Sequence, residues 1–203
     1  GTELDADEFS TIMSAIRANA IDSSGYIAPA EKNNLDLVTW AIRAEQAGWG
    51  YVWGSQGELL TESRFQSLAA SYPKEVGGYE DWIRTHWLGK RTADCSGLIR
   101  GYWWLDAETQ EIKYGSNGIP AMGADAMYQA ASEKGATSTM PEIPGLGVWH
   151  KGHIGIYIGN GEVVEAMSTR KGVVRTQLAS GHWTAWLKIP YINYIESTEE
   201  EVS

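Results

Sequence analysis

Apolar residues recur three and four positions apart in four segments of the chain, which is the spacing of one face of an α-helix. Residues that cap helices precede the first three segments: Asp5 or Asp7, then Asn34, then Thr61. The fourth helix is expected to begin at or just before Cys95, and a shorter one to cover residues 125–132. The four apolar stripes are Phe9, Ile12, Met13 and Ile16; Leu37, Val38, Ala41 and Ile42; Phe65, Leu68, Ala69 and Tyr72; and Leu98, Ile99, Tyr102 and Trp103.

From Val148 onward the pattern changes to the strict alternation of a β-strand, with isoleucines at every second position of residues 153–158. Residues 173–174 and 186–191 predict two further strands. Residues 74–91 are rich in tryptophan and predict irregular structure. Helices followed by a small antiparallel sheet indicate an α+β fold.

The hairpin around residues 159–161 decides which side chains share a face of that sheet. A two-residue loop, Asn160-Gly161, would place Glu165 on the isoleucine face. A three-residue loop with one glycine at a bulge pairs Ile156 with Val164 and keeps that face apolar. The second register is therefore favoured, and it places His153 and Glu165 on the opposite face, within reach of each other.

The composition limits which classes of protein this chain can belong to. The 203 residues are 43% hydrophobic and 21% charged, which is ordinary for one soluble globular domain, and no apolar run is long enough to span a membrane. The net charge of −10 argues against a nucleic-acid binder, which is expected to carry a basic surface. A single cysteine excludes an internal disulfide, so that residue serves either packing or chemistry.

The position of this cysteine favours chemistry. At the first turn of a helix, unpaired backbone N–H groups and the positive end of the helix dipole stabilise a thiolate. The alternative is a buried thiol that packs as a small hydrophobic group. The predicted His153–Glu165 pair favours the first interpretation, because a carboxylate orients an imidazole and stabilises an imidazolium beside a thiolate. Cys95, His153 and Glu165 are thus candidates for nucleophile, base and orienting residue.

His150 competes with His153 for the role of base, although its place beside Lys151-Gly152 indicates a turn. A metal pair His150-x-x-His153 is an alternative, but no third ligand follows at suitable spacing. We expect neither a metal nor a cofactor.

Three segments, taken together and in this order, resemble the NlpC-type cysteine peptidases of bacterial cell walls. They are Tyr51-Val52-Trp53-Gly54, Asp94-Cys95-Ser96-Gly97-Leu98 and residues 153–161, HIGIYIGNG. The resemblance covers roughly residues 35–192. It implies a papain-like α+β fold, in which the nucleophile helix packs on an antiparallel sheet. It also implies hydrolysis of peptidoglycan stem peptides, usually between γ-D-glutamate and the following diamino acid.

The resemblance also implies roles for other residues. Tyr51, Asp94 and Ser96 correspond to residues that line the substrate site in the family, and Trp53 is expected to line the cleft beside them. The chain departs from the family in two ways. Glu165 stands where the family most often has His, Asn or Gln, and an insertion of residues 55–91 is expected to add a helix, and Trp82 or Trp87, to the cleft wall.

These features predict a helical extension over residues 1–34, a peptidase domain over 35–195 and an acidic flexible tail over 196–203. We expect a monomeric cysteine endopeptidase that acts on peptidoglycan stem peptides and does not bind nucleic acid. Its expected location is secreted or wall-associated in a bacterium, with an upstream signal or anchor removed. The alternatives are an amidase or acyltransferase on the same Cys–His scaffold, a toxin directed at the walls of rival bacteria, or a wall-binding module without catalysis.

Overall fold

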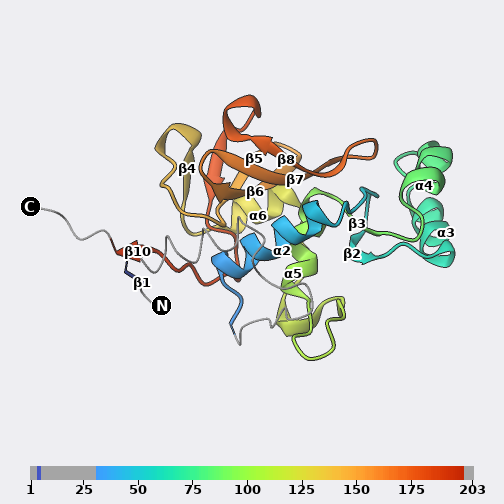
Figure 1. The fold of residues 1–203 in the computed structure, drawn as a ribbon, viewed down its shortest axis with the longest axis horizontal. Helices are drawn as coiled ribbons and strands as arrows, with labels where there is room; N and C mark the ends of the chain where they lie inside the picture. The colour runs from blue at the N-terminus through green and yellow to red at the C-terminus, as the bar shows by residue number, and fades with distance from the viewer. Residues whose placement is uncertain (1–3, 6–30, 199–203) are drawn as a thin grey trace, which may run out of the picture.

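The computed structural model describes residues 4–5 and 31–198 of the chain. Its centre is an antiparallel sheet with the strand order β4-β9-β5-β6-β7-β8, and helices α2 and α5 lie against it (Figure 1). This arrangement confirms the predicted α+β class, with the nucleophile helix packed on an antiparallel sheet. The bounds are α2 Asn34–Gln46, α5 Cys95–Trp103, β4 Lys134–Ala136, β5 Gly147–His150, β6 His153–Gly159, β7 Glu162–Ser168, β8 Gly172–Gln177 and β9 Ala185–Leu187.

The main hydrophobic core lies between the two helices and one face of the sheet. The apolar stripes predicted for α2 and α5 are buried there, as are the three isoleucines of β6. A smaller cluster covers the other face of the sheet and includes Val148, Tyr157 and Val163. The helical and strand periodicities therefore identified the residues that hold α5 on the sheet.

The N-terminus of α2 differs from the prediction by one residue. Asn33, not Asn34, caps the helix and accepts a hydrogen bond from the backbone N–H of Asp36 at 2.8 Å. Asn34 is fully buried instead, and its amide donates to the carbonyls of Pro144 and Ile195 at 2.8 and 2.9 Å. A buried amide needs such partners, so Asn34 ties α2 to the loop before the sheet and to the C-terminal segment.

The hairpin between β6 and β7 combines the two registers considered from the sequence. Gly159 pairs with Glu162 across a two-residue turn, Asn160-Gly161, in which both residues have positive φ. A bulge between Tyr157 and Gly159 then shifts the pairing, so that Ile156 faces Val164. The predicted pairing of the core is confirmed, but the extra residue lies in β6 rather than in the loop.

The insertion of residues 55–91 forms a small helical unit. Strands β2 (Gln56–Leu59) and β3 (Arg91–Ala93) pair at its base, and helices α3 (Glu62–Ser71) and α4 (Glu80–His86) lie side by side, away from the main sheet (Figure 1). Thr61 caps α3 as predicted, whereas α4 was not predicted. The unit has its own core, made of Leu60, Phe65, Leu68, Val76 and Ile83, and Val52 from the preceding segment packs into it.

The remaining elements are short. Helix α6 covers Ala124–Ala130, close to its predicted range, and Leu4–Asp5 (β1) pairs in parallel with Ser197–Thr198 (β10). The 3-10 turns are η1 Gly77–Tyr79, η2 Ser116–Gly118, η3 Thr137–Thr139 and η4 Leu178–Ser180. The predicted helix that carries Phe9 to Ile16 lies outside the described residues. None of the helices in the described part of the chain has the length and hydrophobicity that crossing a bilayer requires.

Candidate active site

Cys95 is the first residue of α5 and is partly exposed. Asp94 caps this helix: its Oδ1 accepts from the backbone N–H of Gly97 at 2.7 Å. Its Oδ2 accepts from the backbone N–H of Gly54 at 2.7 Å, which ties the start of the helix to the Tyr51–Gly54 segment. The thiol therefore sits at a fixed, capped helix N-terminus, where backbone N–H groups favour negative charge.

His153 opens strand β6 and contacts two of the predicted site residues. Its Nε2 lies 3.0 Å from Glu165 Oε1, and Cys95 lies close enough to the ring to raise the pKa of the imidazole. Glu165 engages Nε2, so Nδ1 is the ring nitrogen that remains for a second partner. Thr176 Oγ1 donates to the second Glu165 oxygen at 2.7 Å. The fold thus joins His153, Glu165 and Thr176 by hydrogen bonds and places Cys95 near the same imidazole.

The electrostatics of this group favour a charged imidazole. Burial alone lowers the pKa of His153, but hydrogen bonds and negative charge from Cys95 and Glu165 outweigh burial and raise the pKa to about 9. Burial raises the pKa of Glu165, but hydrogen bonds from His153 and Thr176 outweigh burial and lower it below its ordinary value. At neutral pH the site therefore holds an imidazolium beside a carboxylate, which can stabilise a thiolate.

Trp183 covers the ring of His153. The two rings are nearly parallel, with an interplanar angle of 12° and centroids 5.3 Å apart. Gly155 makes room for the indole, because a Cβ at that position would lie 3.0 Å from Trp183. The sequence pattern did not reveal this contact, since Trp183 lies in a loop without periodicity. His150, the competing base, lies beside the same indole, with ring centroids 5.5 Å apart.

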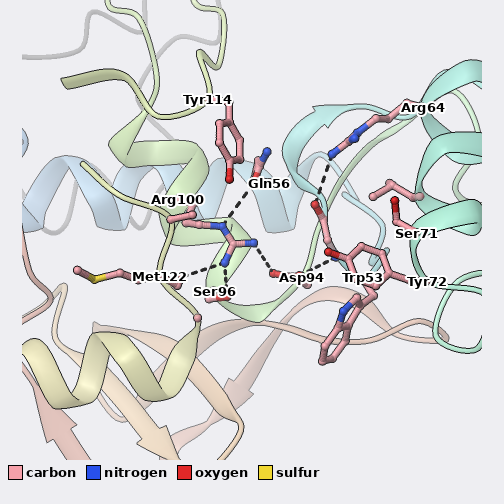
Figure 2. Close-up of a pocket in the computed structure, with 14 residues that line it drawn as sticks. Trp53, Gln56, Arg64, Ser71, Tyr72, Asp94, Ser96, Arg100, Tyr114 and Met122 are labelled. Carbon is pink, nitrogen blue, oxygen red and sulfur yellow. Dashed lines mark hydrogen bonds and ion pairs between the residues drawn. The ribbon is translucent and has the colours of Figure 1, made fainter. Parts of the chain in front are cut away.

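A pocket of about 480 Å³ opens next to the nucleophile helix (Figure 2). Three of the predicted substrate residues, Trp53, Asp94 and Ser96, line it together. The fourth, Tyr51, lies near Cys95 and Asp94. Burial of its hydroxyl, and to a smaller extent the negative charge of these two neighbours, raises its pKa well above the ordinary value. Tyr51 therefore stays a neutral hydrogen-bond donor. Three of the four predicted substrate residues therefore share this pocket, and Tyr51 lies close to Cys95.

Arg100 is a buried residue of this pocket that the sequence analysis missed. Its guanidinium donates to Ser96 Oγ and to the carbonyl of Met122, and it pairs with Asp94 Oδ1 at 3.2 Å (Figure 2). The side chain holds the two residues that flank Cys95 and neutralises the carboxylate. A signal was present in the sequence, because a lone cation on an apolar helix must find partners when the helix is buried.

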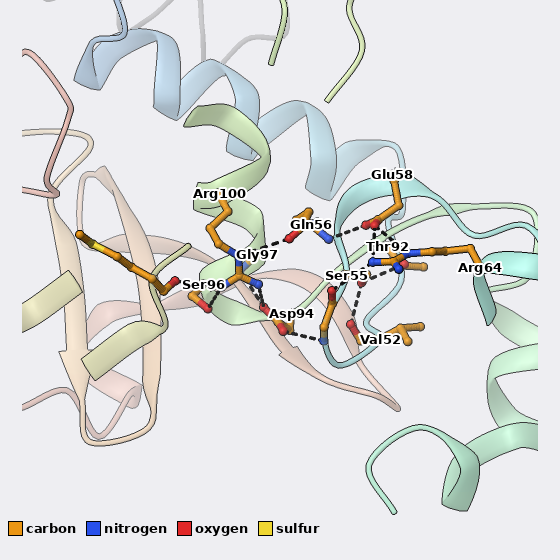
Figure 3. A network of polar contacts seen from close by, with 12 residues as sticks. Val52, Ser55, Gln56, Glu58, Arg64, Thr92, Asp94, Ser96, Gly97 and Arg100 are labelled. Atoms are coloured by element: carbon orange, nitrogen blue, oxygen red, sulfur yellow. Dashed lines mark hydrogen bonds and ion pairs between the residues drawn. The ribbon is translucent and has the colours of Figure 1, made fainter. Parts of the chain in front are cut away.

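A polar network joins the nucleophile helix to the insertion (Figure 3). Arg100 Nε lies 3.4 Å from Gln56 Oε1, and the backbone N–H of Gln56 donates to Glu58, which forms an ion pair with Arg64 of α3 at 2.9 Å. Glycine permits this approach: a Cβ at Gly97 would lie 2.0 Å from the carbonyl oxygen of Ser55. The insertion is therefore connected directly to the wall of the pocket.

No three His, Cys, Asp or Glu side chains within residues 4–5 and 31–198 gather into a group that could hold a metal ion.

Comparison with known proteins gives a match to one sequence family. The sequence profile of the NlpC/P60 family matches residues 48–190. No curated protein sequence matches the chain.

Solved structures give weaker likenesses. NlpC2 from Trichomonas vaginalis is 15% identical with a TM-score of 0.45; the alignment covers 79% of this chain and 49% of that protein, so the chain spans about half its length. The NlpC/p60 domain of the peptidoglycan hydrolase SagA is 16% identical with a TM-score of 0.43, covering 77% and 99%. The peptidoglycan hydrolase RipB from Mycobacterium tuberculosis is 18% identical with a TM-score of 0.43, covering 92% and 87%. The family relationship therefore depends on the sequence match.

Proposed function

The chain belongs to the NlpC/P60 family, and from that premise we propose that it is a cysteine peptidase that hydrolyses the stem peptides of bacterial cell-wall peptidoglycan. The observation that carries the proposal is the hydrogen bond between His153 and Glu165, with Cys95 close enough to raise the pKa of the same imidazole. A base that is oriented by a carboxylate and faces a thiol at a helix N-terminus is the arrangement that nucleophilic thiol catalysis needs. A secreted or wall-associated location follows from this substrate.

The proposed reaction has two steps. The Cys95 thiolate attacks the carbonyl carbon of the scissile amide, and backbone N–H groups at the start of α5 stabilise the oxyanion. The imidazolium of His153 gives its proton to the leaving amine, which leaves a thioester on the sulfur. His153 then accepts a proton from water, which attacks the thioester and releases the carboxylic acid. Glu165 keeps the ring oriented through both steps and stabilises its charged form.

The proposed bond is the amide between γ-D-glutamate and the next diamino acid, as the resemblance of the sequence motifs implies. The pocket next to the start of α5 suits a polar peptide ligand, because Trp53 offers an apolar face and Gln56 and Arg64 add polar groups at its wall. The amidase and acyltransferase alternatives predict other products, namely a stem peptide freed from its sugar or a transferred acyl chain.

The test is digestion of purified peptidoglycan, with mass spectrometry of the released fragments. The native chain is expected to produce a new γ-carboxyl group on D-glutamate and a new amino group on the diamino acid. Cys95→Ala is expected to abolish release while circular dichroism shows an unchanged fold. Release that persists in this variant would disprove the role of the thiol. Binding to the wall without any turnover by the native chain would favour a non-catalytic module.

A matched pair of histidine variants tests the assignment of the base. His153→Ala is expected to reduce turnover by about 10²–10⁴-fold, the usual contribution of general acid–base catalysis. His150→Ala removes a neighbouring imidazole, whose ring centroid lies 5.3 Å from that of His153, and is expected to retain most of the turnover. The reverse result would assign the base to His150. Because the chain has a single cysteine, one equivalent of a thiol reagent should also inactivate the native protein.

A further inference from the structure

A second pocket, of about 310 Å³, lies where the insertion meets the turn between β7 and β8. Tyr51 and Trp53 line it from the segment next to Cys95, Tyr79 from the insertion, and Met167 from β7. Trp53 also lines the first pocket, so the two pockets adjoin across its indole. The second pocket therefore borders the candidate active site.

Contacts between the insertion and the hairpin turn fix the walls of this pocket. Trp87 Nε1 donates to the carbonyl of Thr169 at 2.6 Å, and the guanidinium of Arg170 lies 4.9 Å from the ring centre of Trp82. Gly172 approaches Trp87 so closely that a Cβ there would lie 2.9 Å from the indole. The tip of the β7–β8 hairpin extends toward the insertion (Figure 1). These contacts preorganise the site, which lowers the entropy cost of binding.

The lining of this second pocket combines exposed apolar side chains with two charged side chains, Glu75 and Arg170. The side chains of Trp53, Tyr79 and Met167 keep 45%, 40% and 37% of their surface exposed. Large apolar side chains that are exposed together at one site usually mark an interaction surface. The carboxylate of Glu75 is exposed and has no hydrogen-bond or ion-pair partner among the described residues. The guanidinium of Arg170 contacts only the ring of Trp82 there. A ligand for this pocket must offer both an apolar face and polar edges.

We propose that this pocket is a saccharide subsite, which holds one pyranose ring of the glycan strand while the attached peptide lies at Cys95. A pyranose presents C–H groups on its faces, which pack on the rings of Trp53 and Tyr79. Its hydroxyl and acetamido groups lie at the edge, where they donate to Glu75 and accept from Arg170. The volume is at the lower end of the range for small-ligand sites, about 300–1,000 Å³, which suits a single ring.

A peptide side chain fits this lining less well. An aliphatic chain would cover the aromatic rings but offer no partner to Glu75 or Arg170, which are both exposed. A sugar ring satisfies both at once. The proposal rests on the proposed function, in which the substrate peptide is attached to a glycan strand, and it assigns a purpose to the insertion that separates Tyr51 from Cys95.

The test compares two substrates that share one peptide: the free stem peptide, and the same peptide attached to the N-acetylglucosaminyl-N-acetylmuramyl disaccharide. Tyr79→Ala and Glu75→Gln are each expected to lower kcat/KM for the glycosylated substrate by roughly tenfold, the effect of one aromatic or charged contact. Their kcat/KM for the free peptide is expected to match that of the native chain. Tyr191→Ala, which removes another exposed tyrosine outside both pockets, is the control and should change neither value.

Equal losses on both substrates would assign the pocket to the peptide and overturn the proposal, as would the absence of any loss on the glycosylated substrate. If the native chain cleaves neither substrate, the proposed function fails. Titration of the Cys95→Ala protein with the peptide-free disaccharide, followed by NMR, then decides the subsite independently. Binding that Tyr79→Ala weakens supports the saccharide site, whereas no binding, or equal binding by both proteins, overturns it.

Discussion

The substitution Glu165→Gln isolates the charge that stabilises the imidazolium of His153. Glutamine has nearly the same shape and keeps one oxygen, which can still accept a hydrogen bond from His153 Nε2 or from Thr176. The negative charge 3.0 Å from the ring is lost. Geometry is therefore largely retained while electrostatic support is removed.

The magnitude follows from the shift in the pKa of His153. Its rise from 6.5 to about 9 corresponds to about 3–4 kcal/mol in favour of the imidazolium, at about 1.4 kcal/mol per unit. Cys95 and Glu165 both contribute to this rise, so removal of the Glu165 charge is expected to lower the pKa of His153 by about one unit or more. The sign is downward, because the lost neighbour favoured the charged form.

Two measurements check this expectation. NMR titration of the four histidines gives the pKa of His153 directly, and the pH profile of kcat/KM shows its consequence. Near pH 6 the ring is protonated in both proteins and the activities should be similar. Between pH 7 and 9 the variant should lose activity first, because its imidazolium deprotonates at lower pH. Glu162→Gln, on the same strand, is the control. An unchanged pKa of His153 in Glu165→Gln would refute the electrostatic role of Glu165.

Three further predictions concern stability and positioning. Because the folded-state pKa of His153 is raised, its contribution to stability should be complete below pH 6.5 and lost as the pH rises through about 9. In urea unfolding, the free energy of unfolding of His153→Gln should therefore fall less over this pH range than that of the native chain. Gly101→Ala would place a Cβ 2.2 Å from the carbonyl oxygen of Gln56. This overpacking should cost about 1–3 kcal/mol, more than the gain in helix propensity of about 1 kcal/mol, and so lower Tm. An unchanged Tm would contradict this expectation. Trp183→Ala should uncover the ring of His153 and lower kcat at least several-fold with KM little changed. Trp183→Phe should keep an aromatic ring over His153 and retain much of the rate. Equal losses of kcat in both variants would contradict a stacking role.

The sequence by itself determined the elements whose pattern is local. Periodicity identified the apolar faces of α2 and α5, and the start of α5 at Cys95 followed from where its stripe begins. The need to keep isoleucines on one face selected the pairing of Ile156 with Val164, which in turn predicted that His153 and Glu165 meet. These inferences hold because a helix face and a strand register depend on spacing within a short segment.

Only the tertiary structure decided the contacts between segments that are distant in the chain. The approach of His153 to Cys95, the cover of Trp183 and the partners of Arg100 depend on how α5 and the loops pack on the sheet, and no periodicity encodes that packing. Helix α4 was missed because its seven residues, with glycines before and after them, are too short to show a helical pattern, and its Trp82 contacts Arg170 of the β7–β8 turn. Side-chain burial across segments, rather than local spacing, therefore fixed the pockets and their chemistry.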